Sequence, residues 1–270
     1  MKQATIYCLA ILSLSLSANA QVVNTKSTGN QSLTSMKGAY LLTMQKATQD
    51  HKDTIADIKQ LKIYTDHYFM YAHLLPGDTM GNFGVGSYTI QNGKVAEHGF
   101  FTSDGGAQDN NFDVKITKSP GGYTQVINFP PDAQGSEFIL TESYKDVSSS
   151  ISSALDGAWK MTKMTTYTKE GTPTVIDKPL EYKFYQSGHF MFGSNQTDPA
   201  TNKVFTGIGY GTYKVDGPND ITETPMNASY RDIINVPVKL KLAFNGKDHY
   251  QQTIVWTDGS KMIEEYERLK

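Results

Sequence analysis

Six histidines and two repeated pairs of glutamates are the side chains that could do chemistry in this sequence. The histidines are His51, His67, His73, His98, His189 and His249. None has the His-x-x-x-His or His-Glu-x-x-His spacing that places two imidazoles on one zinc ion. His73 and His98 could meet across strands beside Glu97 and bind a metal or haem. We nevertheless expect solvated or structural histidines, with no metal site and no cofactor.

The glutamates form one pair in each half of the chain. Glu97 and Glu223 follow a Gly-x-Tyr segment, and Glu142 and Glu264 lie near the end of each half. Two carboxylates can act as general acid and base. Because both halves keep both glutamates, one repeated structural role is a simpler explanation than two identical active sites. No Gly-x-Ser-x-Gly elbow or phosphate loop is present, so we predict no catalytic residues and a non-enzymatic protein.

The glutamates belong to a duplication that covers most of the sequence. Gly38-Ala39-Tyr40 returns 119 residues later as Gly157-Ala158-Trp159, and Glu142-Ser143-Tyr144 returns 122 residues later as Glu264-Glu265-Tyr266. A period near 120 exceeds the ~20–50 residues of solenoid repeats and suits a module with its own core. We predict two domains, 36–147 and 154–270, joined by a serine-rich linker at 148–153.

Each repeat is expected to consist of short strands. Leu61 to Tyr64 and Tyr68 to Tyr71 read as a hairpin whose copy is 182–192, and Asn92-Gly93 is a strong turn dipeptide. Seven or eight strands per repeat favour a closed barrel, with a β-sandwich as the alternative. The helical spacing of Ile55, Ile58 and Leu61 predicts a short helix over 48–60. The corresponding residues 166–178 read as a loop, so the repeats are expected to differ there.

The second repeat resembles the lipocalin-like domains of secreted bacterial proteins, a group related to lipocalins and fatty-acid-binding proteins. The resemblance rests on Gly-x-Trp, the Phe-Met hairpin, Gly-x-Tyr and the closing Glu-x-Tyr-x-Arg. It implies an antiparallel barrel around a cavity, in which Arg268 covers Trp159 by cation–π attraction. In the first repeat these positions are Tyr40 and Asp146, where a hydroxyl could donate to a carboxylate. We predict contact between Trp159 and Arg268.

A ligand would lie inside such a barrel. An eight-stranded barrel is just wide enough to be filled by side chains or to hold one small ligand. Phe69, Tyr71, Phe190 and Phe192 share one face of the two hairpins and are the candidate ligand-binding residues, while Met70 and Met191 share the other face. Plain core packing is the alternative interpretation of these aromatics.

The remaining properties limit location and partners. Residues 1–20 have the early lysine, apolar run and Ala-x-Ala site of a signal peptide. We therefore expect a secreted or periplasmic protein that starts near Gln21, with a flexible leader over 21–35. The single cysteine, Cys8, lies in the signal. Without Lys2 the chain has 24 basic and 27 acidic residues, which gives no reason to expect nucleic-acid binding, and no later segment is long and apolar enough for a membrane span.

The leading expectation is a non-enzymatic protein that binds a small apolar or amphipathic ligand in a barrel cavity. The alternative is an interaction module with filled barrels, whose loops contact a partner protein or a glycan. An internal cavity of at least ~300 Å³ lined by any of the four candidate aromatics would favour the first of these hypotheses, and filled interiors would favour the second.

Overall fold

The computed structural model describes residues 33–75, 80–104, 106–197 and 203–270. The predicted signal peptide and nearly all of the predicted leader lie outside this part of the chain. Residues Ser32–Lys270 belong to one compact unit, which contains both repeats. No helix of the described residues is long and apolar enough to cross a membrane.

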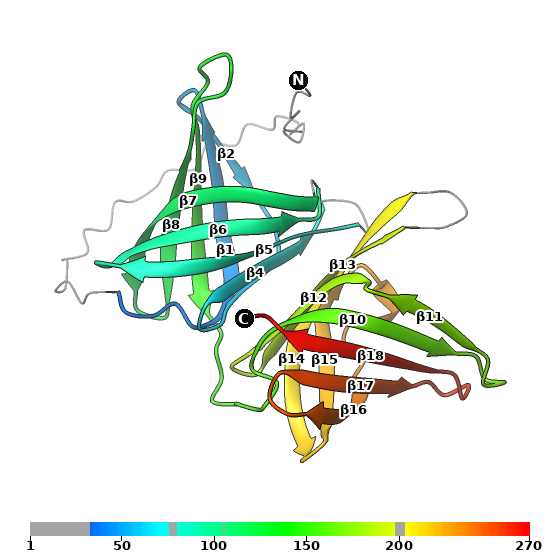
Figure 1. Cartoon of the computed structure of the whole chain (residues 1–270). Helices are drawn as coiled ribbons and strands as arrows, with labels where there is room; N and C mark the ends of the chain where they lie inside the picture. Colours follow the sequence, from blue (N-terminus) through cyan, green and yellow to red (C-terminus); the bar gives the residue numbers. More distant parts are fainter. Residues whose placement is uncertain (1–32, 76–79, 105, 198–202) are drawn as a thin grey trace. The chain divides into compact units, whose positions relative to one another are not determined.

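Each repeat forms an antiparallel sheet of nine strands (Figure 1). The first repeat contains β1 Gly38–Gln49, β2 Lys52–Ala56, β3 Gln60–Tyr64, β4 Tyr68–Leu74, β5 Gly81–Gln91, β6 Lys94–Thr102, β7 Gly106–Ser119, β8 Gly122–Phe129 and β9 Phe138–Asp146. The second contains β10 Gly157–Tyr167, β11 Pro173–Asp177, β12 Leu180–Gln186, β13 His189–Thr197, β14 Val204–Gly217, β15 Asp220–Ala228, β16 Val238–Asn245, β17 His249–Val255 and β18 Lys261–Arg268, with a short 3-10 helix at Arg231–Ile233.

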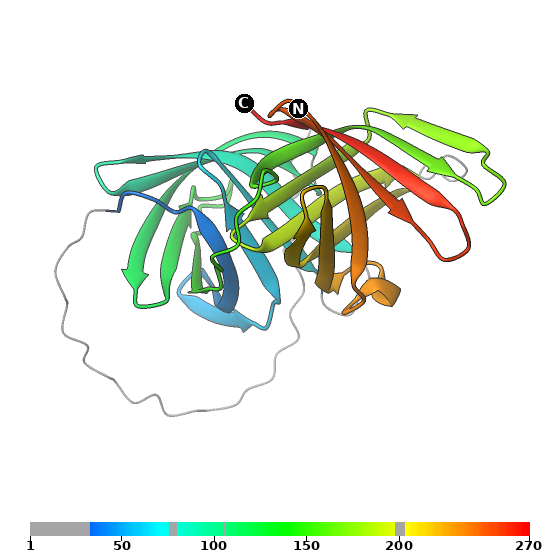
Figure 2. The same cartoon turned by 90° about the horizontal axis from the view of Figure 1, so that it is seen from below.

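Each sheet closes on itself, because β1 also pairs with β9 and β10 also pairs with β18. One half of β1 pairs with β3 and the other half with β2, so β2 and β3 share one position in the ring. The result is two closed eight-stranded antiparallel barrels in tandem, as predicted, and Figure 2 gives a second view of the strands curving around each interior. Among the described strands, β2 and β11 pair on one side only, with β1 and β10.

The turns follow the predicted chemistry in most places. Asn92 and Gly93 have φ angles of 52° and 76° between β5 and β6, as a two-residue hairpin of type I′ requires. The hairpin of β12 and β13 uses Ser187 and Gly188 in the same way, with φ of 51° and 79°. Both predicted hairpins are therefore confirmed.

The predicted helix over 48–60 is wrong. This segment contains the end of β1, a turn at Asp50 and His51 with φ of 47° and 65°, and β2. Ile55 is 71% exposed, so its helical spacing does not reflect a buried face. Residues 166–178 also form a hairpin, between β10 and β11, with a longer loop at 168–172. The repeats are alike at a point where we expected them to differ.

The hydrophobic residues form three clusters. One lies inside each barrel, around Tyr123 in the first and Trp159 in the second. The third combines both repeats and includes Met70 and Met191. A Cβ atom on Gly193 would lie 2.8 Å from Met70 Cε, which shows how closely the two walls pack. The outer face of each hairpin is thus as buried as its inner face.

The predicted linker is attached to both repeats. Ser148 Oγ accepts a hydrogen bond of 3.0 Å from the Ala39 backbone N–H in the first repeat. The Ser149 backbone N–H donates to the Ser187 carbonyl in the second repeat, at 2.8 Å. The serine-rich composition therefore serves hydrogen bonding to backbone groups here.

Candidate functional site

The first barrel contains a cavity of about 280 Å³ beside Phe69 and Tyr71. Both side chains come from β4 and point inward, since alternate residues of a strand face the same side. This volume falls slightly below the ~300 Å³ that we set as favouring ligand binding. Two of the four candidate aromatics thus line a cavity, whereas Phe190 is fully buried in the core of the second barrel and Phe192 packs against that core.

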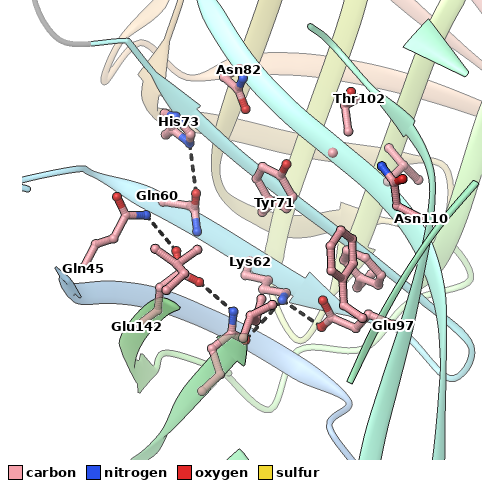
Figure 3. Close-up of a pocket in the computed structure, with 18 of the residues that line it drawn as sticks. Gln45, Gln60, Lys62, Tyr71, His73, Asn82, Glu97, Thr102, Asn110 and Glu142 are labelled. Carbon is pink, nitrogen blue, oxygen red and sulfur yellow. Dashed lines mark hydrogen bonds and ion pairs between the residues drawn. The ribbon is translucent and has the colours of Figure 1, made fainter. Parts of the chain in front are cut away.

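The cavity has an apolar wall, a polar floor and a polar mouth (Figure 3). The wall includes Phe69, Phe112, Ile127, Phe129 and Leu140, while Val85 and Phe101 belong to the cluster shared by the two repeats. The buried polar floor consists of Lys62, Glu97, Gln125 and Glu142. Partly exposed polar residues nearer the mouth are Gln45, His73, Asn82 and Thr102. Such a lining suits an amphipathic guest better than a purely apolar one.

A glycine keeps the lumen open beside Tyr71. A Cβ atom on Gly84 would lie 2.5 Å from Tyr71 Cε1, so the ring occupies the space that a side chain on β5 would fill. The phenol therefore lies flat against the wall. Phe69 lies against Gly86 in the same way. A larger residue at either position would push the aromatic ring toward the cavity.

The floor begins with a buried ion pair. Lys62 Nζ donates to Glu97 Oε1 at 2.8 Å and to Gln125 Oε1 at 3.3 Å, and it lies 4.9 Å from the Phe69 ring centroid. The Tyr64 hydroxyl donates to the same glutamate. Buried charges require such partners, because burial of an unpaired charge costs several kcal/mol or more.

The floor continues as a chain of hydrogen bonds to the mouth. Gln125 Nε2 donates to Glu142 Oε2 at 2.6 Å, and the Tyr144 hydroxyl donates to the same oxygen at 3.0 Å. Gln60 Nε2 donates to the Tyr144 hydroxyl at 2.6 Å. The chain ends at His73, whose Nδ1 lies 2.9 Å from Gln60 Oε1 (Figure 3). A second amide, Gln45, donates to Glu142 Oε1 at 2.8 Å.

The second barrel repeats this floor. The strand registers match Lys62, Glu97, Gln125, Glu142 and Tyr144 with Lys183, Glu223, Gln252, Glu264 and Tyr266. Lys183 pairs with Glu223 at 2.9 Å, and Gln252 donates to Glu264. The repeated glutamates are thus parts of a buried structural network in both barrels, as their retention suggested.

One member of the network differs in charge. Gln60 is matched by Glu181, whose Oε1 is hydrogen-bonded to the Tyr266 hydroxyl at 2.7 Å. Burial, and then the neighbouring charge of Glu264, raises the pKa of Glu181 to about 8. Burial also raises the pKa of Glu264. At neutral pH the carboxyl of Glu181 is mainly protonated and resembles the glutamine of the first barrel.

The mouths of the barrels differ most. Asn82 Nδ2 donates to Asp104 Oδ2 at 2.7 Å in the first barrel. The matching residues are Gly207 and Tyr230, because Ser103 and Ser229 make the same hydrogen bond to the facing strand. The Tyr230 hydroxyl lies 2.8 Å from where a Cβ of Gly207 would be. A tyrosine therefore covers the interior at a place where the first barrel has small polar side chains.

The predicted contact between Trp159 and Arg268 is confirmed. Arg268 Cζ lies 4.0 Å from the indole centroid, within cation–π range. Its guanidinium also donates to the carbonyl oxygens of Asp156, Ala154 and Lys247, at 2.8, 3.1 and 3.0 Å. The arginine thus closes one end of the second barrel and satisfies backbone groups that would otherwise lack donors.

Tyr40 and Asp146 occupy the equivalent place in the first barrel and are cross-strand partners. Asp146 Oδ1 accepts a hydrogen bond of 2.8 Å from the Ser148 backbone N–H. Among the described contacts there is no hydrogen bond from the Tyr40 hydroxyl to Asp146. Tyr40 packs edge-on against Tyr123 with centroids 4.9 Å apart, so aromatic packing closes this end.

His73 and His98 do not come together with Glu97 to form the metal or haem site that their sequence positions allowed. His73 faces the cavity, but His98 follows the inward-facing Glu97 on β6 and therefore points outward. His98 Nε2 lies 2.8 Å from Asp109 Oδ1, while Glu97 is bonded to Lys62 and Tyr64. In the described part of the chain, no group of three histidine, cysteine or acidic residues could hold a metal ion.

Sequence reasoning missed Lys62, Gln125 and Gln60, and it considered His73 only as a ligand of a metal or haem. The repeated Leu-Lys-Ile-Tyr and Tyr-Lys-Phe-Tyr segments contained a signal, since each places a lysine on the same face as the tyrosine two residues later. Because that face also carries Phe69 in the neighbouring strand, the lysine could have been assigned to the interior. The contribution of His73 depends on its register with Gln60 and has no local signal.

Comparisons with known proteins give little beyond the structure. No protein-family model matches the chain, and no curated protein matches it. A redesigned β-barrel has 16% identity over 46% of this chain and all of its own, with a TM-score of 0.30. A protein of unknown function of the DUF3598 family from Nostoc punctiforme has 9% identity over 87% of this chain and 96% of its own, with a TM-score of 0.27.

Proposed function

We propose that the first barrel binds one small amphipathic molecule in its lumen and that the second barrel is a structural partner. The observation that carries this proposal is the cavity of about 280 Å³ beside Phe69 and Tyr71. Its apolar wall would hold a hydrocarbon or ring, and its polar mouth would hold a head group. The protein would then resemble lipocalin-like proteins in function as well as in architecture.

The packing of the second barrel supports this division of roles. Tyr230 covers its interior where Asn82 and Asp104 stand in the first barrel, and Met164 replaces Gln45. Met164 and Phe192 pack against the core of that barrel. We therefore assign ligand binding to the first barrel alone.

We propose a binding protein and not an enzyme. The acidic side chains that could act in acid–base catalysis, Glu97 and Glu142, already accept two and three hydrogen bonds from neighbouring side chains. A general base must reach the proton of a substrate, and these carboxylates instead hold the floor together.

Residues 1–20 support export, which is part of the proposal. Their pattern is that of a cleaved signal peptide. N-terminal sequencing of the protein isolated from its host should give a chain that starts near Gln21 in a periplasmic or extracellular fraction. A cytoplasmic chain that retains residues 1–20 would contradict this assignment.

The binding proposal is tested with the neutral fluorescent probe N-phenylnaphthylamine and the full-length chain. Leu140 lines the cavity, and Met262 is the matching residue of the second barrel. We expect one probe per chain, loss of binding in Leu140→Trp and wild-type binding in Met262→Trp. Equal effects of the two variants, or binding that survives in Leu140→Trp, would refute the proposal.

A further inference from the structure

The donor and the acceptor of each hydrogen bond in the floor of the first barrel can be assigned, and these bonds converge on Glu142. As a carboxylate, Glu142 accepts, so the ends of Gln45 and Gln125 that face it are the amide N–H groups. Gln125 then presents its oxygen to Lys62, which can only donate. Glu142 on one side and Lys62 on the other therefore require the same orientation of the Gln125 amide.

The same assignment of donors and acceptors extends through Tyr144 and Gln60 to His73. The single hydroxyl proton of Tyr144 goes to Glu142, so Tyr144 accepts from Gln60 Nε2. Gln60 Oε1 then faces His73 Nδ1 and must accept from it. Burial lowers the pKa of His73 to about 4, so the imidazole is neutral at physiological pH. A neutral ring with its proton on Nδ1 has Nε2 as an acceptor.

The mouth adds further acceptors. Asn82 donates its N–H to Asp104, which leaves the amide oxygen Oδ1 of Asn82 at the wall of the cavity. Asp104 contributes a carboxylate beside it. Together with His73 Nε2, these groups can accept hydrogen bonds from a ligand that donates, while the Tyr71 hydroxyl and the Asn110 amide, which also line the cavity, can donate to it.

The charges of the site point the same way. Lys62 is the only lysine or arginine among the described residues that line the cavity, and it is already paired with Glu97. Glu142 adds a negative charge to the floor, and Asp104 adds another at the mouth. A ligand carboxylate would meet acceptors and like charges, which oppose binding.

From this geometry we infer that the ligand of the first barrel has a head group that donates hydrogen bonds and carries no negative charge, with His73 Nε2 as its acceptor. The inference rests on the proposed function and specifies its ligand class: a hydroxyl or amine amphiphile, in contrast to a fatty carboxylate.

Three probes of equal chain length test this inference, namely decanol, decyl methyl ether and decanoate. Calorimetry with the full-length chain should show decanol binding about three- to tenfold more tightly than the ether, which cannot donate. Decanoate should bind more than about tenfold more weakly than decanol. Decanoate binding as tightly as decanol would overturn the inference and leave the proposed function standing. Failure of all three probes to bind would overturn both.

The role of His73 has its own test. His73→Phe should remove the preference for decanol over the ether while the affinity for the ether stays within about twofold, because only one acceptor is lost. Since this variant also takes a donor from Gln60 and could impair folding, nitrogen NMR of wild-type His73 provides a second readout. We expect the neutral tautomer with its proton on Nδ1. A proton on Nε2 would overturn the assignment.

Discussion

Asn82 donates a hydrogen bond of 2.7 Å to Asp104 at the mouth of the first barrel, where the second barrel has Gly207 and Tyr230. This pair is the clearest local difference between two barrels that share their strand order and buried polar floor. A small polar pair leaves space above the floor, whereas a tyrosine ring fills it. Under the proposed function, this difference accounts for ligand binding in the first barrel alone.

Placing the second barrel's pair in the first barrel should close the binding site. The double substitution Asn82→Gly and Asp104→Tyr should close the first barrel. It should weaken the binding of N-phenylnaphthylamine at least about tenfold, because the new tyrosine ring would occupy the space that the probe needs. The reverse exchange, Gly207→Asn with Tyr230→Asp, should leave the original site intact. Fluorescence titration measures both variants. Unchanged affinity in the closed variant would be incompatible with a ligand in this lumen.

Glu181 should make the stability of the protein depend on pH. Its pKa is about 8 in the folded chain and about 4.5 in an unfolded one. The folded state therefore holds a proton that the unfolded state loses, so stability falls as pH rises from about 4.5 to about 8. Glu181→Gln should flatten this fall and melt at a higher temperature than wild type at pH 8. Thermal melts across this range provide the measurement.

The first barrel supplies a matched control for this prediction. Gln60→Glu introduces the same carboxyl into the other copy of the network. It should steepen the fall in stability over the same pH range, since a second buried acid must then stay protonated. Parallel pH profiles for wild type and Glu181→Gln would show that Glu181 titrates normally.

Arg268 should be a main support of the second barrel. Arg268→Met removes the stacking on Trp159 and three hydrogen bonds to backbone carbonyls. We expect a loss of roughly 2–4 kcal/mol in the free energy of unfolding. The exposed arginine of the 3-10 helix serves as the control, and Arg231→Met should change stability by less than about 0.5 kcal/mol. Urea denaturation of both variants measures these free energies of unfolding, and equal values for the two variants would contradict a stabilising role of Arg268.

Much of the fold followed from the sequence, because the repeats show the same strand signals twice. The hairpin beginning at Leu61, the Asn92-Gly93 turn and the contact of Trp159 with Arg268 all rest on local or paired signals. The helix over 48–60 failed because the turn at Asp50 and His51 has positive φ without a glycine. Such turns are hard to recognise from residue type.

The candidate site was only half predictable. Phe69 and Tyr71 were identified, because bulky residues at alternate positions indicate an inner face. The buried Lys62 was not, because apolar residues on either side of it usually mark the core side of a strand. Here Leu61 and Ile63 point outward into the cluster shared by the two repeats. A strand covered on both faces loses the alternation that distinguishes inside from outside.

The central claim is that an amphiphile occupies the first barrel, and intermolecular NOEs test it most directly. Decanol bound to the full-length chain should show NOEs from its alkyl protons to the rings of Phe69 and Tyr71, which line the cavity. NOEs to Phe190 and Phe192 in place of these, or to surface residues alone, would contradict the account.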